Sequence, residues 1–129
     1  MNGIKLLLDT NFIIGLIKRT EPVIKILAAS SIALDECAYS FITRIELLSY
    51  PAITQPEIES IESILATMHY VSTSKEIENT TIRLRRQYRL KTPDAIVAAT
   101  AIALNLELLT LDQQLAKQMQ AILVQENNP

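Results

Sequence analysis

Four acidic side chains in this chain stand beside apolar segments, where a charge needs an explanation. Asp9 directly ends the apolar run Leu6–Leu8, and Asp112 closes the stretch ELLTLD. Glu46 lies within the largely apolar FITRIELLSY, and Asp94 begins an alanine-rich segment in KTPDA. Carboxylate oxygens suit hard cations such as Mg²⁺ or Mn²⁺, which activate water and bind phosphate oxygens. If the four acids converge, they favour metal-assisted attack of water on a phosphodiester.

Helix capping is the alternative explanation for three of these acids, and the sequence leaves it open. Asp9 and Asp112 each stand between a predicted strand and a predicted helix, where Asp is a favoured N-cap residue. For Asp94, Thr92 is able to cap a helix and Pro93 suits the first helical position. An acid in that first turn complements the helix dipole.

Glu46 has a different alternative, as an ordinary surface glutamate paired with Arg44 or another base.

Convergence of all four acids has an electrostatic cost that isolated acids do not have. Two carboxylates about 4 Å apart repel by roughly 4 kcal/mol at an effective dielectric constant of 20. A cluster is therefore unfavourable without a cation or a shared proton.

Cysteine and histidine chemistry is narrowly limited, because the chain has one residue of each kind, Cys37 and His69. A disulfide within the chain is impossible, and a Cys/His zinc site needs more ligands. Cys37 stands in the apolar-flanked ECAYSF and is interpreted as a small core residue. His69 has no motif around it and is interpreted as a structural or surface residue. Any metal is therefore expected to be a hard cation held by carboxylates.

The composition predicts one soluble domain spanning residues 1–129, with a loose tail, QENNP, from about residue 125. Hydrophobic residues make up 49% of the chain, enough for one core. No apolar stretch approaches the roughly 18 residues that span a bilayer, and Asp9 interrupts the first one too early for a signal peptide. We therefore expect a cytoplasmic protein without membrane contact. The net charge of −2 excludes a general electrostatic affinity for nucleic acid, but not local binding.

Short apolar runs alternate with segments of helical periodicity, which predicts an α/β layered fold around a mainly parallel sheet. Ligands bind such sheets at the carboxyl ends of strands, where Asp9 and Asp112 stand. The expected strands are 4–8, 37–41, 70–72, 107–110 and 122–124. The expected helices begin at Asn11 and then cover 21–29, 42–50, 57–68, 74–89, 92–104 and 113–119.

Three segments, in this order, resemble a PIN domain: KLLLDTNFIIGLI, SFITRIELL and LKTPDAIVAATAIALNLELLTLD. The D-T-N after a strand and the P-D-A-x-x-A-A-T-A helix followed by T-x-D are the more specific parts. The compact size is similar to that of the VapC-type toxins of bacterial toxin–antitoxin pairs. The resemblance extends from Ile4 to about Val124.

This resemblance implies a PIN-like three-layer fold, with a mainly parallel five-stranded sheet flanked by helices and an acidic pocket that holds Mg²⁺ or Mn²⁺. The implied activity is metal-dependent endoribonuclease cleavage of RNA. A small cognate antitoxin protein and a homodimer are the implied partners. The family's acids match Asp9, Glu46, Asp94 and Asp112, and its supporting polar residues match Asn11 and Thr110.

The last motif departs from the family pattern. Many members follow the final acid with another acid and a phenylalanine, but here Asp112 is followed by Gln113, Gln114 and Leu115. The fourth carboxylate therefore has no neighbouring acid to support metal binding.

A basic run, RLRRQYRLK at 83–91, is the one local concentration of positive charge in the sequence. It is a candidate phosphate-binding rim with a tyrosine available to stack on a base. The alternatives are a solvated helix end that complements the dipole, or a contact with an antitoxin or a second subunit. The candidate RNA-binding residues are Arg83, Arg85, Arg86, Tyr88, Arg89 and Lys91.

A function of another class is also open: a catalytically silent PIN-fold module that binds a partner protein or RNA. Such a module would retain the fold and the capping acids. Metal binding distinguishes the two, because an enzyme of this type binds Mn²⁺ through its carboxylates and a scaffold need not.

Overall fold

The computed structural model describes residues 3–127 as an α/β protein with one four-stranded sheet. The sheet order is β3-β2-β1-β4, and every neighbouring pair is parallel. The strands are β1 Leu6–Leu8, β2 Cys37–Ser40, β3 His69–Val71 and β4 Glu107–Leu109. The helices are α1 Thr10–Lys18, α2 Glu21–Ser30, α3 Phe41–Leu48, α4 Gln55–Leu65, α5 Lys75–Tyr88, α6 Thr92–Leu104 and α7 Gln113–Glu126, with a 3₁₀ turn at Leu34–Glu36. Within these residues no helix is long and apolar enough to cross a membrane.

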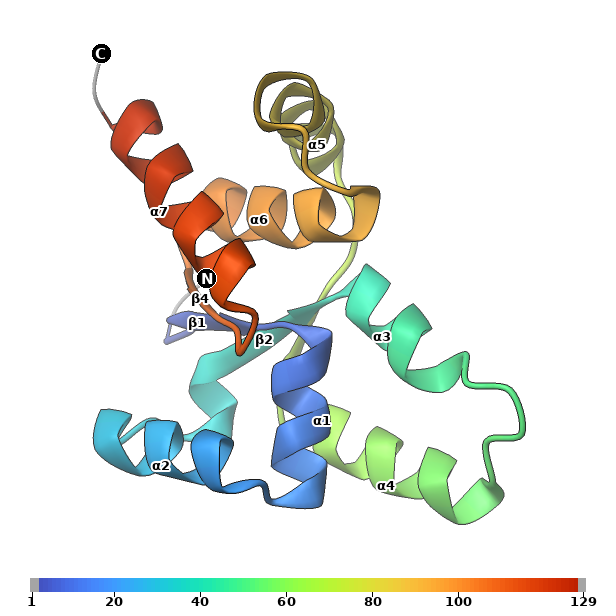
Figure 1. The fold of residues 1–129 in the computed structure, drawn as a ribbon. Coiled ribbons are helices and arrows are strands. Elements are labelled where there is room, and N and C mark those ends of the chain that lie inside the picture. Colours follow the sequence, from blue (N-terminus) through green and yellow to red (C-terminus); the bar gives the residue numbers. More distant parts are fainter. Residues whose placement is uncertain (1–2, 128–129) are drawn as a thin grey trace.

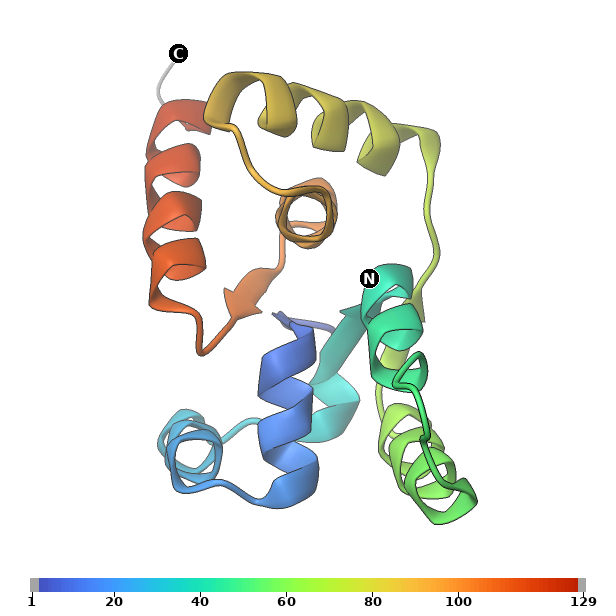
Figure 2. The same ribbon diagram turned by 45° about the vertical axis from the view of Figure 1, so that its right-hand side comes forward.

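Helices cover both faces of the sheet, which gives three layers. In Figure 1, α5, α6 and α7 lie above the sheet and α1, α2 and α4 lie below it. Figure 2 views α6 almost end-on, in the middle of the upper layer between α5 and α7. α3 follows β2 at the carboxyl end of the sheet. The three-layer, mainly parallel architecture predicted from sequence is therefore confirmed.

The leucine run of β1 is apolar throughout because both of its faces are covered. Leu7 belongs to the core beneath α5, α6 and α7, whereas Leu6 and Leu8 belong to the opposite core with residues of α1, α2 and α4. All three side chains are at most 2% exposed. β1 is also an inner strand, paired with β2 and β4, so its carboxyl end is fixed from two sides.

The predicted fifth strand at 122–124 is wrong. Those residues belong to α7, which continues from Gln113 to Glu126. Its buried residues Leu115, Met119 and Ile122 recur at helical spacing, so one face of a single helix packs on the core. A short apolar run has the same composition in a strand and in a buried helix, and here the helical register prevails.

The predicted tail from about residue 125 begins inside this helix. Gln125 accepts a hydrogen bond from the Tyr88 hydroxyl at 2.6 Å, and Glu126 pairs with Arg83 at 2.5 Å. These two contacts join the last turn of α7 to α5. Asn127 is the C-cap of α7, and the last two residues of the predicted tail, Asn128 and Pro129, lie outside the described residues.

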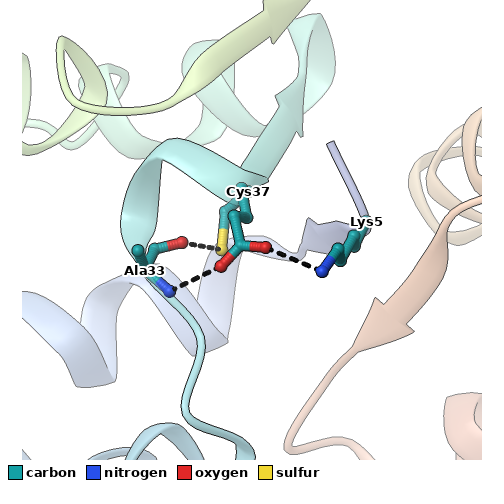
Figure 3. Close-up of polar contacts among 4 residues, drawn as sticks. Lys5, Ala33 and Cys37 are labelled. Atoms are coloured by element: carbon teal, nitrogen blue, oxygen red, sulfur yellow. Dashed lines mark hydrogen bonds and ion pairs between the residues drawn. The ribbon is translucent and has the colours of Figure 1, made fainter. Parts of the chain in front are cut away.

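Cys37 is a core residue, as predicted. Figure 3 shows its thiol donating a weak hydrogen bond to the Ala33 carbonyl, at 3.6 Å. The neighbouring Glu36 accepts from the Ala33 amide and pairs with Lys5 at 3.0 Å. Burial is the main cause that raises the pKa of the Cys37 thiol to about 11, so the thiol stays protonated and unreactive. His69 lies exposed in the edge strand β3.

The contact between α1 and α2 depends on the absence of a side chain at Gly15. A Cβ atom there would lie 2.6 Å from Val23 Cγ2 and 2.9 Å from Thr20 Oγ1. Val23 is fully buried, so its methyl group has no space into which to withdraw.

We expect Gly15→Ala to lower the free energy of unfolding by about 1–3 kcal/mol, because the new methyl group overpacks this contact. Helix propensity alone predicts the opposite, a gain of roughly 1 kcal/mol. Urea unfolding followed by circular dichroism measures the difference. In the double variant with Val23→Ala, the cost of Gly15→Ala should shrink. A Gly15→Ala protein as stable as the parent would contradict the close contact.

Candidate active site

The four predicted acids line one cavity of about 400 Å³. They come from four separate places in the chain. Asp9 follows β1, Glu46 lies on α3, Asp94 on α6, and Asp112 precedes α7. The cavity thus lies at the carboxyl end of the sheet, where ligands of parallel sheets bind. Its other lining residues are Thr10, Asn11, Ser49, Tyr50, Pro51, Pro93, Val97 and Leu115.

Asp9 is the buried acid of the site, with 7% of its surface exposed. Its Oδ1 accepts a hydrogen bond from the Phe12 amide at 2.9 Å, so it is the N-cap of α1. Its Oδ2 accepts a hydrogen bond from the Thr110 hydroxyl. The capping interpretation is therefore correct for Asp9, but the cap occupies only one oxygen, and the residue still borders the cavity.

Thr110 connects two of the acids. Its hydroxyl donates to Asp9 and accepts from the Asp112 amide at 3.0 Å. Asp112 in turn caps α7, because its Oδ1 accepts from the amides of Gln114 and Leu115 at 3.0 and 3.2 Å. One hydroxyl thus fixes the end of β4 against the end of β1.

Glu46 is directed towards the cavity by a threonine that the sequence analysis did not single out. The Thr10 hydroxyl donates to Glu46 Oε1 at 2.5 Å and lies 3.4 Å from the hydroxyl of the buried Thr43. The alternative pairing of Glu46 with Arg44 is wrong, because Arg44 pairs with Glu62 at 2.9 Å. Thr10 therefore couples the first turn of α1 to α3.

Asp94 lies in the first turn of α6, after Pro93, but the predicted Thr92 cap is wrong. Lys91 occupies the N-cap position without a side-chain hydrogen bond, and Thr92 is the first helical residue. Within residues 3–127 the Asp94 carboxylate has no hydrogen-bond partner. Burial raises its pKa, as do the charges of Asp112 and Glu46, and Lys91 partly opposes them.

The site is strongly negative, because four carboxylates line the cavity and no Lys or Arg of the described chain does. Burial also raises the pKa of Asp9, and the charges of Asp112 and Asp94 add to that effect. Hydrogen bonds from Thr110 and the Phe12 amide act in the opposite direction and favour the ionised carboxylate. The charges of Asp9, Asp94 and Asp112 therefore repel one another, and the charge of Glu46 acts on Asp94.

The donor set fits a hard divalent cation, since carboxylate oxygens with no thiol or imidazole border the cavity. In residues 3–127, no group of three or more His, Cys, Asp or Glu side chains is close enough to hold one ion. Mg²⁺ usually binds through one or two carboxylates and retains several waters. The arrangement therefore suits an ion bound partly through water. Asp9, Glu46, Asp94 and Asp112 are the residues that would hold it.

None of the six candidate RNA-binding residues lines this cavity. Arg83 and Tyr88 are engaged by the end of α7, and Arg85 Nε donates to the Leu90 carbonyl at 3.3 Å. Tyr88 also packs against the core, so its ring is only partly available for stacking. Arg86, Arg89 and Lys91 remain exposed, and Lys91 is near enough to influence Asp94.

Comparison with known proteins places the chain in a family. A model of the PIN domain matches residues 6–119, and the chain therefore belongs to the PIN domain family. PIN domains are generally nucleases and typically use divalent metals. No curated protein matches the sequence significantly.

Solved structures similar to this chain include a toxin–antitoxin complex and VapBC complexes. A chain of a toxin–antitoxin complex from Klebsiella pneumoniae is 31% identical, with a TM-score of 0.71, covering 82% of this chain and 85% of that one. VapBC2 from Rickettsia felis, bound to a DNA fragment from its promoter, is 20% identical, with a TM-score of 0.74 and coverage of 89% and 92%. VapBC-1 from nontypeable Haemophilus influenzae is 24% identical, with a TM-score of 0.72 and coverage of 92% and 94%. The last two show a shared fold.

We expect Asp94→Asn to stabilise the metal-free protein at pH 7, by about 1 kcal/mol or less because the group is partly solvated. The folded-state pKa of Asp94 is raised, so the folded parent binds a proton more readily than the unfolded chain. The parent should therefore gain stability as the pH falls through its raised pKa. The advantage of the variant should shrink towards zero as the pH falls below about 3.9, the pKa expected of an unfolded Asp. Thermal unfolding of both proteins between pH 7 and pH 3.5 measures this convergence, and an equal difference at every pH would contradict it.

Proposed function

We propose that this protein is a metal-dependent endoribonuclease, the toxin of a bacterial toxin–antitoxin pair. The observation that carries the proposal is the convergence of four carboxylates from four elements on one cavity without a basic side chain. A folded protein has little reason to maintain such repulsion unless a cation compensates it. Membership of the PIN family supports nuclease activity.

The carboxylates of Asp9, Glu46, Asp94 and Asp112 would hold one or two Mg²⁺ or Mn²⁺ ions, directly or through water. When bound, such an ion lowers the pKa of a coordinated water and offsets charge on the phosphate. Asp9 is kept in one orientation by Thr110 and the Phe12 amide. Asn11, on the first turn of α1, offers an amide group to the same cavity. Hydrolysis adds water across a P–O bond, so one RNA fragment retains the phosphate and the other gains a hydroxyl.

The proposed partners follow from the same assignment. The similar chain from Klebsiella pneumoniae belongs to a toxin–antitoxin complex, which supports a cognate antitoxin protein for this chain. The resemblance to VapC-type toxins further implies a homodimer and a place of action in the cytoplasm. The exposed cations Arg86, Arg89 and Lys91 are the best candidates among the basic run for contacting RNA phosphates.

Cleavage of labelled total bacterial RNA by the purified, antitoxin-free protein tests the activity. With Mg²⁺ or Mn²⁺ we expect discrete fragments, and with chelator none. Asp94→Asn, prepared identically, should lower the cleavage rate by roughly 100-fold or more while remaining folded. Asp9→Asn should do the same. The matched control is Asp35→Asn, since Asp35 is an exposed acid outside the cavity and should be dispensable.

Each contrary result has a definite meaning. Equal cleavage by the parent and Asp94→Asn would reveal a contaminating nuclease or a misplaced site. A folded parent that neither cuts RNA nor binds Mn²⁺ would favour a catalytically silent module that binds a protein or RNA.

Thr10 should support the site through Glu46. Thr10→Val keeps the shape of the side chain but removes the hydrogen bond to Glu46, so we expect Mn²⁺ affinity to fall roughly 10-fold. Thr10→Ser retains a hydroxyl and should restore most of the affinity. Calorimetric titration with Mn²⁺ measures both variants. Unchanged affinity in Thr10→Val would show that Glu46 does not need this contact.

A further inference from the structure

Tyr50 is an exposed aromatic side chain at the border between two hollows of the surface. It is 55% exposed and lines the acidic cavity. It also lines a neighbouring apolar groove of about 450 Å³ between α1 and α4, with Ile14, Ile17 and Ile53 among its walls. Tyr50 belongs to neither core cluster of the described residues, so the exposed part of its ring is free to contact a ligand.

The backbone holds Tyr50 in place through a tight turn. Its carbonyl accepts a hydrogen bond from the Ile53 amide at 3.2 Å, which closes a four-residue turn with Pro51 and Ala52 in the middle. Proline restricts the backbone at the second position, and Ala52 has a φ of +63°, as the third position of a type II turn requires. A non-glycine residue in this left-handed region is strained, and such strain is concentrated at functional sites.

We propose that Tyr50 stacks on a nucleobase of single-stranded RNA next to the phosphate in the acidic cavity, and that the apolar groove receives this base. The proposal rests on the ribonuclease function proposed above and identifies a substrate contact for it. Single-stranded RNA exposes unstacked bases that aromatic side chains bind through their faces. Because Tyr50 borders both hollows, they adjoin, and an RNA with a phosphate in the cavity would direct a neighbouring base towards the groove.

The composition of the groove fits this occupant. Its walls are mainly aliphatic, which suits the faces of a base, and Lys18, Glu57 and Ser60 supply polar groups at its margin. Lys18 adds a positive charge, which favours the adjoining RNA backbone. A segment of a partner protein is the competing occupant of the groove. If the groove serves such a segment alone, the bases of an RNA should add nothing to its binding.

Two probes separate stacking from phosphate binding: a fluorescein-labelled 12-nucleotide oligouridylate and a probe of equal length with abasic riboses. Fluorescence anisotropy at low salt measures their binding, with Ca²⁺ in place of Mg²⁺ so that a cation compensates the four carboxylates, and a gel run after each titration checks that the probe is intact. The parent should bind oligouridylate more tightly than the abasic probe. Tyr50→Ala should weaken oligouridylate binding roughly 5- to 150-fold and the abasic probe little. Tyr50→Phe, which keeps the ring, should bind as the parent does.

The matched control is Tyr70→Ala, because Tyr70 is similarly exposed, at 49%, but lines neither hollow. It should leave the affinity for both probes unchanged. If the parent binds both probes equally or binds neither, or if Tyr50→Ala binds as the parent does, stacking is overturned and the groove is left to a protein partner. Stacking without metal-dependent cleavage would sustain this inference and contradict only the ribonuclease proposal.

Discussion

Mutual repulsion among four carboxylates is the constraint on which the arrangement of this protein depends. Three of the four acids are held by hydrogen bonds: backbone amides at the start of α1 and α7 bond Asp9 and Asp112, and the Thr10 hydroxyl bonds Glu46. The helix N-termini also carry partial positive charge, which offsets part of the negative field. The sheet brings these acids near one another, since the carboxyl ends of its parallel strands lie at one edge.

Capping and site formation turn out to be compatible uses of the same side chain. A carboxylate has two oxygens, and a helix cap needs only one of them. In Asp9 the second oxygen faces Thr110, and in Asp112 the cap involves Oδ1 alone. The alternatives that a sequence presents as competitors can therefore both be true of one residue.

Long periodic segments were predictable from sequence, and the order of the elements followed from them. The range of α6 agrees in full, because its alanine-rich run is bounded by Pro93 and Asn105. The last strand was not predictable, since the residues around Ile122 look alike in a strand and in a buried helix. Thr10 and Tyr50 were also missed, because their roles depend on how α1 and α3 meet and on where the chain turns after α3. The spacing of residues along the sequence does not show which helices contact each other or where a turn places a side chain.

The positions of the acids along the chain bear on when the site comes into being during synthesis. The first acid is residue 9 and the last is residue 112, and Thr110 joins their two ends. A ribosome makes a chain from its N-terminus and releases it gradually, so a growing chain carries Asp9, Glu46 and Asp94 well before Asp112 emerges. Until then β4 and α7 are missing and β1 lacks a neighbour on one side. Incomplete chains therefore lack the complete acidic site, and a message broken before the codon for Asp112 yields a product without it.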